Sequence, residues 1–103
     1  MLWRQGDVFI ETVGTIPAQS LSAPLPHGTL VHGELTGHSH RIEDMDMATL
    51  YSGRNAGEVF VMVNDGGARI VHEEHGTITL ETGYYRAWRQ REYSPERIRL
   101  VVD

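Results

Sequence analysis

The chain has 103 residues, of which 40% are hydrophobic and 22% charged, and its formal net charge is −5. These values are typical of a soluble globular protein, so we expect a single domain over residues 1–103. Cysteine is absent, which excludes disulfides, thiolate nucleophiles and cysteine zinc sites. All nine basic residues are arginines, which excludes lysine Schiff-base chemistry. Without an apolar run of roughly 20 residues or a signal peptide, we expect a cytoplasmic protein with no membrane partner.

Short strands separated by turns are predicted for most of the chain. Residues 16–28 are different, because they hold three of the four prolines, and we expect a Pro/Ser-rich surface loop there, either a connector or a mobile arm. The Asn-Asp-Gly-Gly sequence at residues 64–67 predicts a β-hairpin between its flanking strands. The predicted strands cover residues 7–13, 29–35, 38–43, 48–52, 58–63, 68–72, 77–80, 84–93 and 97–102. About eight or nine short strands in so short a chain predict an all-β fold, either a small β-barrel or a compact sandwich.

Two of the six histidines lie in the sequence His38-Ser39-His40, within a predicted strand. Side chains two residues apart on a strand point to the same face, so both imidazoles accompany Ile42, and they face inward if Ile42 does. Two such imidazoles can reach one metal ion. With Gly33 before it and Glu43 or Asp44 after it, this string resembles part of the first cupin motif, one residue off in spacing at each end. That resemblance implies a metal site.

Two further histidines lie in the sequence His72-Glu73-Glu74-His75. In an extended strand His72 and His75 point to opposite faces, so both converge on one site only if the chain bends or bulges there, which Gly76 would permit. On an extended strand His72 shares its face with Glu74, and His75 shares its face with Glu73. Either pair would add one nitrogen and one carboxylate to the imidazoles of His38 and His40, a suitable ligand set for zinc, manganese or iron. Alternatively, the residues of this string are hydrogen-bonded surface residues that bind no metal. We therefore predict a divalent metal bound by His38, His40, His72 and His75.

Arginine and aromatic residues are interleaved in the last segment. Residues 84–103 carry five arginines and three acids, whereas residues 1–83 carry eleven acids and four arginines. Arg89, Arg91 and Tyr93 share one face of the predicted strand, where they are either solvent-exposed or arranged to bind an anion. A solvated strand face is favoured over a nucleic-acid surface, because the chain as a whole is acidic.

Four strings resemble those of a family of small uncharacterised bacterial proteins. They run nearly from end to end of the chain: Arg4-Gln5-Gly6-Asp7-Val8, residues 33–41 (Gly-Glu-Leu-Thr-Gly-His-Ser-His-Arg), Val71-His72-Glu73-Glu74-His75 and Arg89-Gln90-Arg91-Glu92-Tyr93. The resemblance implies no particular activity, and from it we expect a complete small bacterial protein.

Three functions stay open at this point. The first is a metal site, possibly hydrolytic, acting on a small molecule or a phosphodiester. The second is metal-independent acid–base cleavage of RNA or another phosphodiester by paired histidines. The third is a non-catalytic binding module or ring-forming homo-oligomer. The candidate catalytic residues have polar side chains and lie in or beside the two histidine strings or in the arginine-rich last segment: His38, His40, Glu34, Glu74, Arg89, Arg91 and Tyr93.

Overall fold

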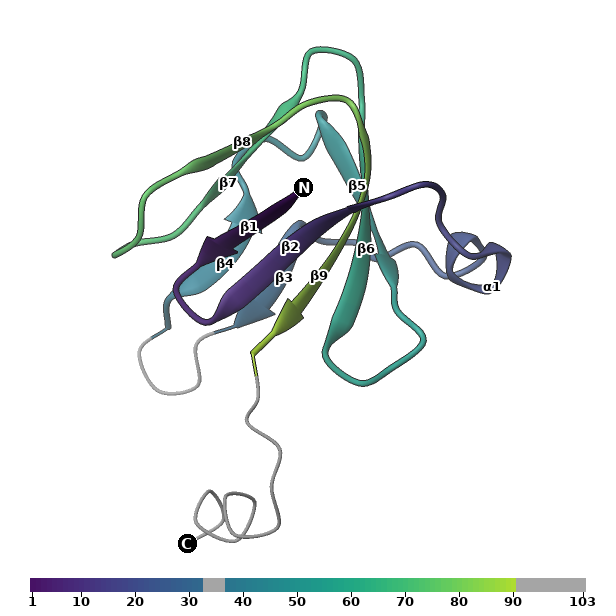
Figure 1. Ribbon diagram of the computed structural model, residues 1–103, viewed down its shortest axis with the longest axis horizontal. Coiled ribbons are helices and arrows are strands. Elements are labelled where there is room, and N and C mark those ends of the chain that lie inside the picture. Colours follow the sequence, from purple (N-terminus) through teal and green to yellow (C-terminus); the bar gives the residue numbers. More distant parts are fainter. Residues whose placement is uncertain (33–36, 91–103) are drawn as a thin grey trace, which may run out of the picture.

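The computed structural model describes residues 1–32 and 37–90, and Figure 1 shows how their strands are arranged. Within these residues nine strands form two antiparallel sheets. One sheet has five strands in the order β1-β2-β9-β6-β5, and the other has four in the order β3-β4-β7-β8. The strands are β1 (Leu2–Gln5), β2 (Val8–Val13), β3 (Thr29–His32), β4 (Ser39–Ile42), β5 (Ala48–Ser52), β6 (Glu58–Val63), β7 (Ala68–Val71), β8 (Ile78–Leu80) and β9 (Gly83–Arg89).

The all-β prediction is confirmed, and the two sheets stay open in the described part of the chain instead of closing into a barrel. Alternating apolar residues of the strands form one core. Ile10 and Leu50 of the larger sheet and Ile70 and Leu80 of the smaller sheet are completely buried in it. Complete burial of each such side chain stabilises the fold by roughly 1.5–3 kcal/mol. The core therefore fixes which residues of each strand face inward.

The predicted hairpin across residues 64–67 is wrong. The strands on either side of that turn, β6 and β7, belong to different sheets. Both edges of β6 are already paired, with β5 and with β9, so β7 has no edge of β6 to join. Gly66 and Gly67 both have positive φ angles, and Gly67 lies directly against the backbone of Leu80. The glycine-rich turn therefore carries the chain from one sheet to the other.

Two elements were not predicted, and several strand ends differ from the prediction. The strand β1 was not expected, because its sequence mixes apolar and polar residues without a clear alternation. The proline-rich loop contains a short helix, α1 (Ala18–Leu21), which follows Pro17 and is too short to show a helical repeat in the sequence. The strand β9 ends at Arg89, and the predicted strand over 97–102 lies outside the described residues. No helix in the part of the chain that the structure describes is long and apolar enough to cross a membrane.

Candidate functional site

Four histidines meet where the beginning of β4 lies beside the connection between β7 and β8. We call His38, His40, His72 and His75 the histidine cluster. The ring of His72 is central: its centroid lies 4.3 Å from that of His40, 4.6 Å from that of His75 and 5.6 Å from that of His38. The rings of His40 and His75 are 6.0 Å apart and nearly parallel. Two strings about 35 residues apart in sequence therefore form one group of imidazoles.

The two strings reach the cluster in different ways. In β4, His40 and Ile42 alternate with half-buried residues and both face the interior, as their spacing predicted. His38 precedes the strand, and its side chain is 29% exposed. The strand predicted over 68–72 ends at Val71, and residues 72–75 form a bend. Because of this bend, His72 and His75 come into contact although they are three residues apart.

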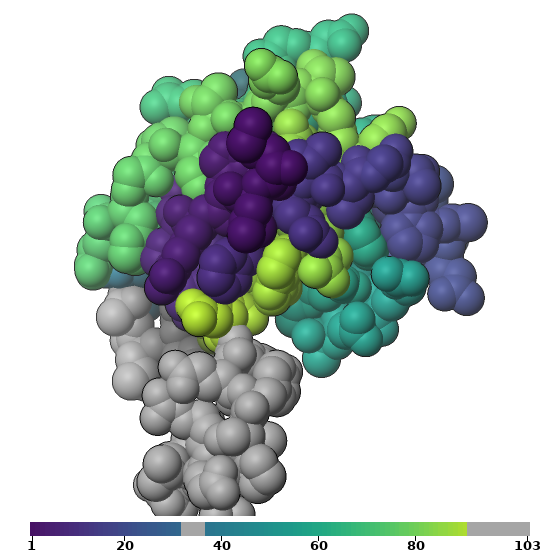
Figure 2. Space-filling view, in the orientation of Figure 1, coloured from purple at the N-terminus to yellow at the C-terminus, as the bar shows by residue number. Residues whose placement is uncertain are grey.

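The turn between β1 and β2 forms another side of the site, and its Gln5 is almost completely buried. The side-chain nitrogen of Gln5 donates hydrogen bonds of 2.9 Å to the carbonyl oxygens of Ile70 and Gly76. Its side-chain oxygen lies 2.9 Å from Nδ1 of His40 and forms a third hydrogen bond. Gln5 therefore ties β4 to both ends of the segment that carries His72 and His75. In Figure 2 the N-terminal residues, in purple, lie against this segment, in green.

Asp7 comes next in the same turn. One of its carboxylate oxygens lies 3.6 Å from Nε2 of His40, and the other lies 3.1 Å from Nε of Arg89 at the end of β9. The backbone oxygen of Asp7 accepts a hydrogen bond from the backbone nitrogen of Gln90. The turn therefore holds a carboxylate between an imidazole and a guanidinium.

Glu73 and Glu74 contact the other histidine string. Glu74 places a carboxylate oxygen 3.0 Å from Nδ1 of His38. Glu73 accepts hydrogen bonds from the backbone nitrogen of Ser39 and from the guanidinium of Arg41. The bond from Ser39 is the largest of several effects that lower the pKa of Glu73 to about 2. Glu73 is therefore ionised at neutral pH, and its hydrogen bonds hold the bend against β4.

The charge state of His40 follows from its surroundings. Burial lowers the pKa of its imidazole to about 4, with His72, His75 and Arg89 acting in the same direction and Asp7 acting against them. His40 is consequently neutral at pH 7. Neutral imidazole, with one nitrogen lone pair available, is the form that binds metal ions.

One group of potential ligand atoms is especially close. Single nitrogen or oxygen atoms of His38, His72 and Glu73 all lie within 4.8 Å of one another. Nδ1 of His72 accepts a hydrogen bond of 3.0 Å from the backbone nitrogen of Glu74. His75 is solvent-exposed, so the cluster is open on that side.

The structure thus brings together six of the residues singled out in the sequence, namely His38, His40, His72, His75, Glu74 and Arg89. Glu34, Arg91 and Tyr93 lie outside the described residues. Sequence reasoning missed Gln5, Gly6 and Asp7, although Asp7 begins the first predicted strand. Their link to the site depends on residues far away in the sequence, as for Gln5 with His40 and Gly76, which are 35 and 71 positions away, and such contacts leave no local pattern.

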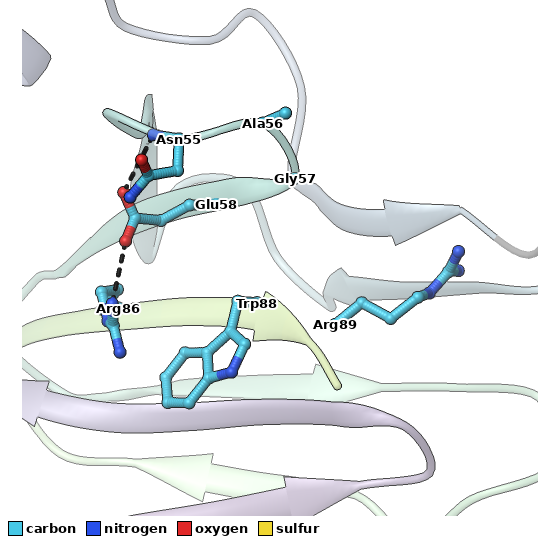
Figure 3. Close-up of a pocket in the computed structure, with 7 residues that line it drawn as sticks. All are labelled: Asn55, Ala56, Gly57, Glu58, Arg86, Trp88 and Arg89. Atoms are coloured by element: carbon cyan, nitrogen blue, oxygen red, sulfur yellow. Dashed lines mark hydrogen bonds and ion pairs between the residues drawn. The ribbon is translucent and has the colours of Figure 1, made fainter. Parts of the chain in front are cut away.

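A pocket of about 230 Å³ lies at the turn between β5 and β6 and is lined by Asn55, Ala56, Gly57, Glu58, Arg86, Trp88 and Arg89. Figure 3 shows its central contact, in which the buried Glu58 accepts a hydrogen bond from Arg86. The other oxygen of Glu58 accepts backbone hydrogen bonds from Arg54 and Asn55. Burial alone would raise the pKa of Glu58, but these bonds and Arg86 lower it overall. Because one carboxylate oxygen holds the turn in place and the other is paired with Arg86 of β9, we assign this network a structural role.

Comparison with known proteins adds a family assignment. The profile of a family described as a domain of unknown function, DUF8820, matches residues 4–90. The chain belongs to this family. The DUF8820 match includes the whole histidine cluster and the turn from Gln5 to Asp7, so the site lies inside the part that defines the family. No curated protein and no solved structure matches the chain.

Proposed function

We propose that the histidine cluster binds a divalent transition metal ion, with zinc, manganese and iron as the candidates. The observation that carries the proposal is the convergence of four imidazoles from two strings, with ring centroids 4.3 to 6.0 Å apart for His40, His72 and His75. Three imidazoles bound to a tetrahedral ion at about 2.0–2.1 Å have ring centroids roughly 5 Å apart. The spacing of these ring centroids is close to that of a three-histidine site, and the individual ligand atoms that lie within 4.8 Å of one another are those of His38, His72 and Glu73.

The groups around the rings support the same proposal. Histidine ligands commonly use their second nitrogen to donate to a carboxylate or carbonyl oxygen, which orients the ring. Glu74 stands in that relation to His38, and the side-chain oxygen of Gln5 stands in that relation to His40.

Metal binding would change the hydrogen bonding of His72. Its Nδ1 accepts the backbone N–H of Glu74, so a neutral His72 holds its proton on Nε2. Coordination through Nε2 requires the other neutral tautomer, with the proton on Nδ1, so the hydrogen bond from the backbone N–H of Glu74 must break. We therefore expect metal binding to perturb the backbone amide of Glu74.

The site is suited to chemistry on an anionic substrate. A divalent metal supplies Lewis acidity and activates water for hydrolysis. Arg89 lies beside Asp7 at the margin of the cluster, where a guanidinium can bind a phosphate or carboxylate. Glu74 is positioned to accept a proton through His38. A hydrolytic function on a small molecule or a phosphodiester follows as the proposed activity.

Metal-independent cleavage of a phosphodiester such as RNA is the second candidate. The observation that favours it is the contact between paired imidazoles, such as His40 and His72 with ring centroids 4.3 Å apart, because two histidines can divide the roles of base and acid. Of the residues expected to stabilise the developing charge, Arg89 is at the site, whereas Arg91 and Tyr93 are outside the described part of the chain. The cytoplasmic location and the homo-oligomer expected from the sequence stay predictions, as does a ring-forming module.

The first experiment is to measure the metal content of tag-free protein by plasma mass spectrometry. The test variant is His38→Ala/His40→Ala, and the control is His27→Ala, because His27 lies in the exposed loop before β3. The proposal predicts near-stoichiometric metal in the wild type and the control, and its loss in the double variant. If neither the purified protein nor protein incubated with zinc, manganese or iron binds metal, the proposal is wrong. RNA cleavage in the presence of EDTA would then favour the second candidate.

A further inference from the structure

The orientation of the Gln5 side-chain amide is determined by its neighbours. Its nitrogen lies 2.9 Å from two carbonyl oxygens, those of Ile70 and Gly76. Carbonyl oxygens only accept hydrogen bonds, so rotating the amide by 180° would place its oxygen against two acceptors and break both bonds. The side-chain oxygen of Gln5 is thus the atom that faces His40.

The tautomer of His40 follows from this orientation. An amide oxygen accepts but does not donate, so Nδ1 of His40 must carry the proton in their hydrogen bond of 2.9 Å. A neutral imidazole then has its lone pair on Nε2. This lone pair is on the side of the ring where Asp7 lies, with 3.6 Å between Nε2 and the nearer carboxylate oxygen.

Two electron-pair donors therefore face each other at the cluster. In a tetrahedral site with bonds of about 2.0–2.2 Å, two ligand atoms are roughly 3.4 Å apart, close to the separation of Nε2 and Oδ1. Oδ1 belongs to a side chain that is 54% exposed, so an ion can reach it from solvent. Nε of Arg89 lies 3.1 Å from the other oxygen of Asp7, which leaves Oδ1 as the carboxylate oxygen on the side of His40.

We propose that Asp7 is a carboxylate ligand of the metal and that Gln5 is the positioning residue that directs Nε2 of His40 toward the same ion. The proposal rests on the proposed function, since it names further parts of that metal site. It gives the site a mixed set of imidazole nitrogens and one carboxylate oxygen, which suits zinc, manganese and iron. An ion pair of Asp7 with Arg89 that has no part in metal binding is the alternative.

The tautomer is tested on the metal-free protein by long-range nitrogen–proton NMR of the histidine rings. The proposal predicts that Nδ1 of His40 is protonated and that Nε2 is not. In Gln5→Met, which keeps the side-chain volume but removes the oxygen, this preference should disappear, whereas the exposed control Gln19→Met should keep it. A wild-type His40 with its proton on Nε2 would overturn the role of Gln5.

The role of Asp7 is tested with Co²⁺, whose visible absorption reports its ligands, and with Zn²⁺ affinity by calorimetry. Asp7→Asn should alter the Co²⁺ spectrum and weaken Zn²⁺ binding by at least roughly 10–100-fold, the range found when even an outer partner of a ligand is lost. Asp65→Asn, at an exposed turn remote from the cluster, should change neither. Because Asp7 is exposed, its variant is expected to fold.

The outcomes separate this inference from the proposed function. If the wild type binds Co²⁺ and Asp7→Asn has the same spectrum and affinity, then Asp7 is not a ligand and the metal site stands without it. If the wild type binds neither Co²⁺ nor Zn²⁺, both proposals fail together. A changed spectrum with weaker binding in Asp7→Asn alone supports the assignment.

Discussion

Gly6 lies so close to the ring of His75 that a Cβ atom at its position would require the ring or the turn to move. A Cβ atom built on Gly6 would be 2.6 Å from Nε2 of His75, and the φ angle of Gly6 is +60°. Both features favour glycine, because a side chain would collide with the imidazole and most other residues are strained at positive φ. The turn between β1 and β2 is thus shaped around one ring of the histidine cluster.

This contact predicts the effect of Gly6→Ala. The added methyl group must displace His75 or the turn, so we expect a loss of about 1–2 kcal/mol in the free energy of unfolding and weaker Zn²⁺ binding. Urea unfolding and calorimetry measure the two effects. Gly14→Ala is the control, because no atom lies within 4 Å of a Cβ at Gly14 and its φ angle is not positive. Equal stability and affinity in the two variants would contradict the prediction.

The low pKa of His40 predicts how stability depends on pH in the metal-free protein. The unfolded chain has a histidine pKa near 6.5 and the folded protein about 4, so the unfolded state binds more protons between these values. Stability is therefore complete above about pH 6.5 and falls by about 3 kcal/mol as the pH decreases to 4. Glu73, whose pKa in the folded protein is about 2, contributes stability above its ordinary pKa of 4.5 and loses this contribution progressively as the pH falls from 4.5 toward 2, so its effect begins only at the acidic end of this range.

The measurement is urea unfolding in EDTA at several pH values from 4 to 7.5. His40→Asn is the test variant, and the slope over this range should be much smaller in it. His27→Ala is the control and should keep the slope of the wild type. If the wild type and His40→Asn show the same dependence on pH, another group is responsible.

The sequence predicted the strands and the two histidine strings because both depend on local features. Alternation of apolar residues defined β2 and β5 almost to the residue, and a continuous apolar run defined β6, because both patterns of burial are local. The turn at residues 64–67 does not form a hairpin because both edges of β6 are already paired. A local motif carries no information about this pairing. For the same reason Gln5 was missed: its partners are distant backbone oxygens and a histidine of another strand.

The ion pair of Glu74 with His38 predicts a moderate effect on metal binding. Glu74→Gln removes the negative charge beside Nδ1 of His38 but keeps the backbone N–H that His72 accepts. Because the carboxylate orients the ring of His38, we expect Zn²⁺ affinity to fall by roughly 10-fold with little change in stability. Glu81→Gln is an exposed control in the turn after β8. Calorimetry that gave the same affinity for both variants would remove Glu74 from the site.

The network around Glu58 predicts a loss of stability without a change in metal affinity. Glu58→Gln places a donor nitrogen or a neutral oxygen opposite the guanidinium of Arg86, which loses its buried anion. The cost of breaking one side of a buried charged hydrogen bond is about 1–3 kcal/mol, so the free energy of unfolding should fall by that amount. Zn²⁺ affinity should not change, because Glu58 contacts no member of the histidine cluster. If Glu58→Gln weakens Zn²⁺ binding as much as Asp7→Asn does, the pocket beside Trp88 is coupled to the metal site and has more than a structural role.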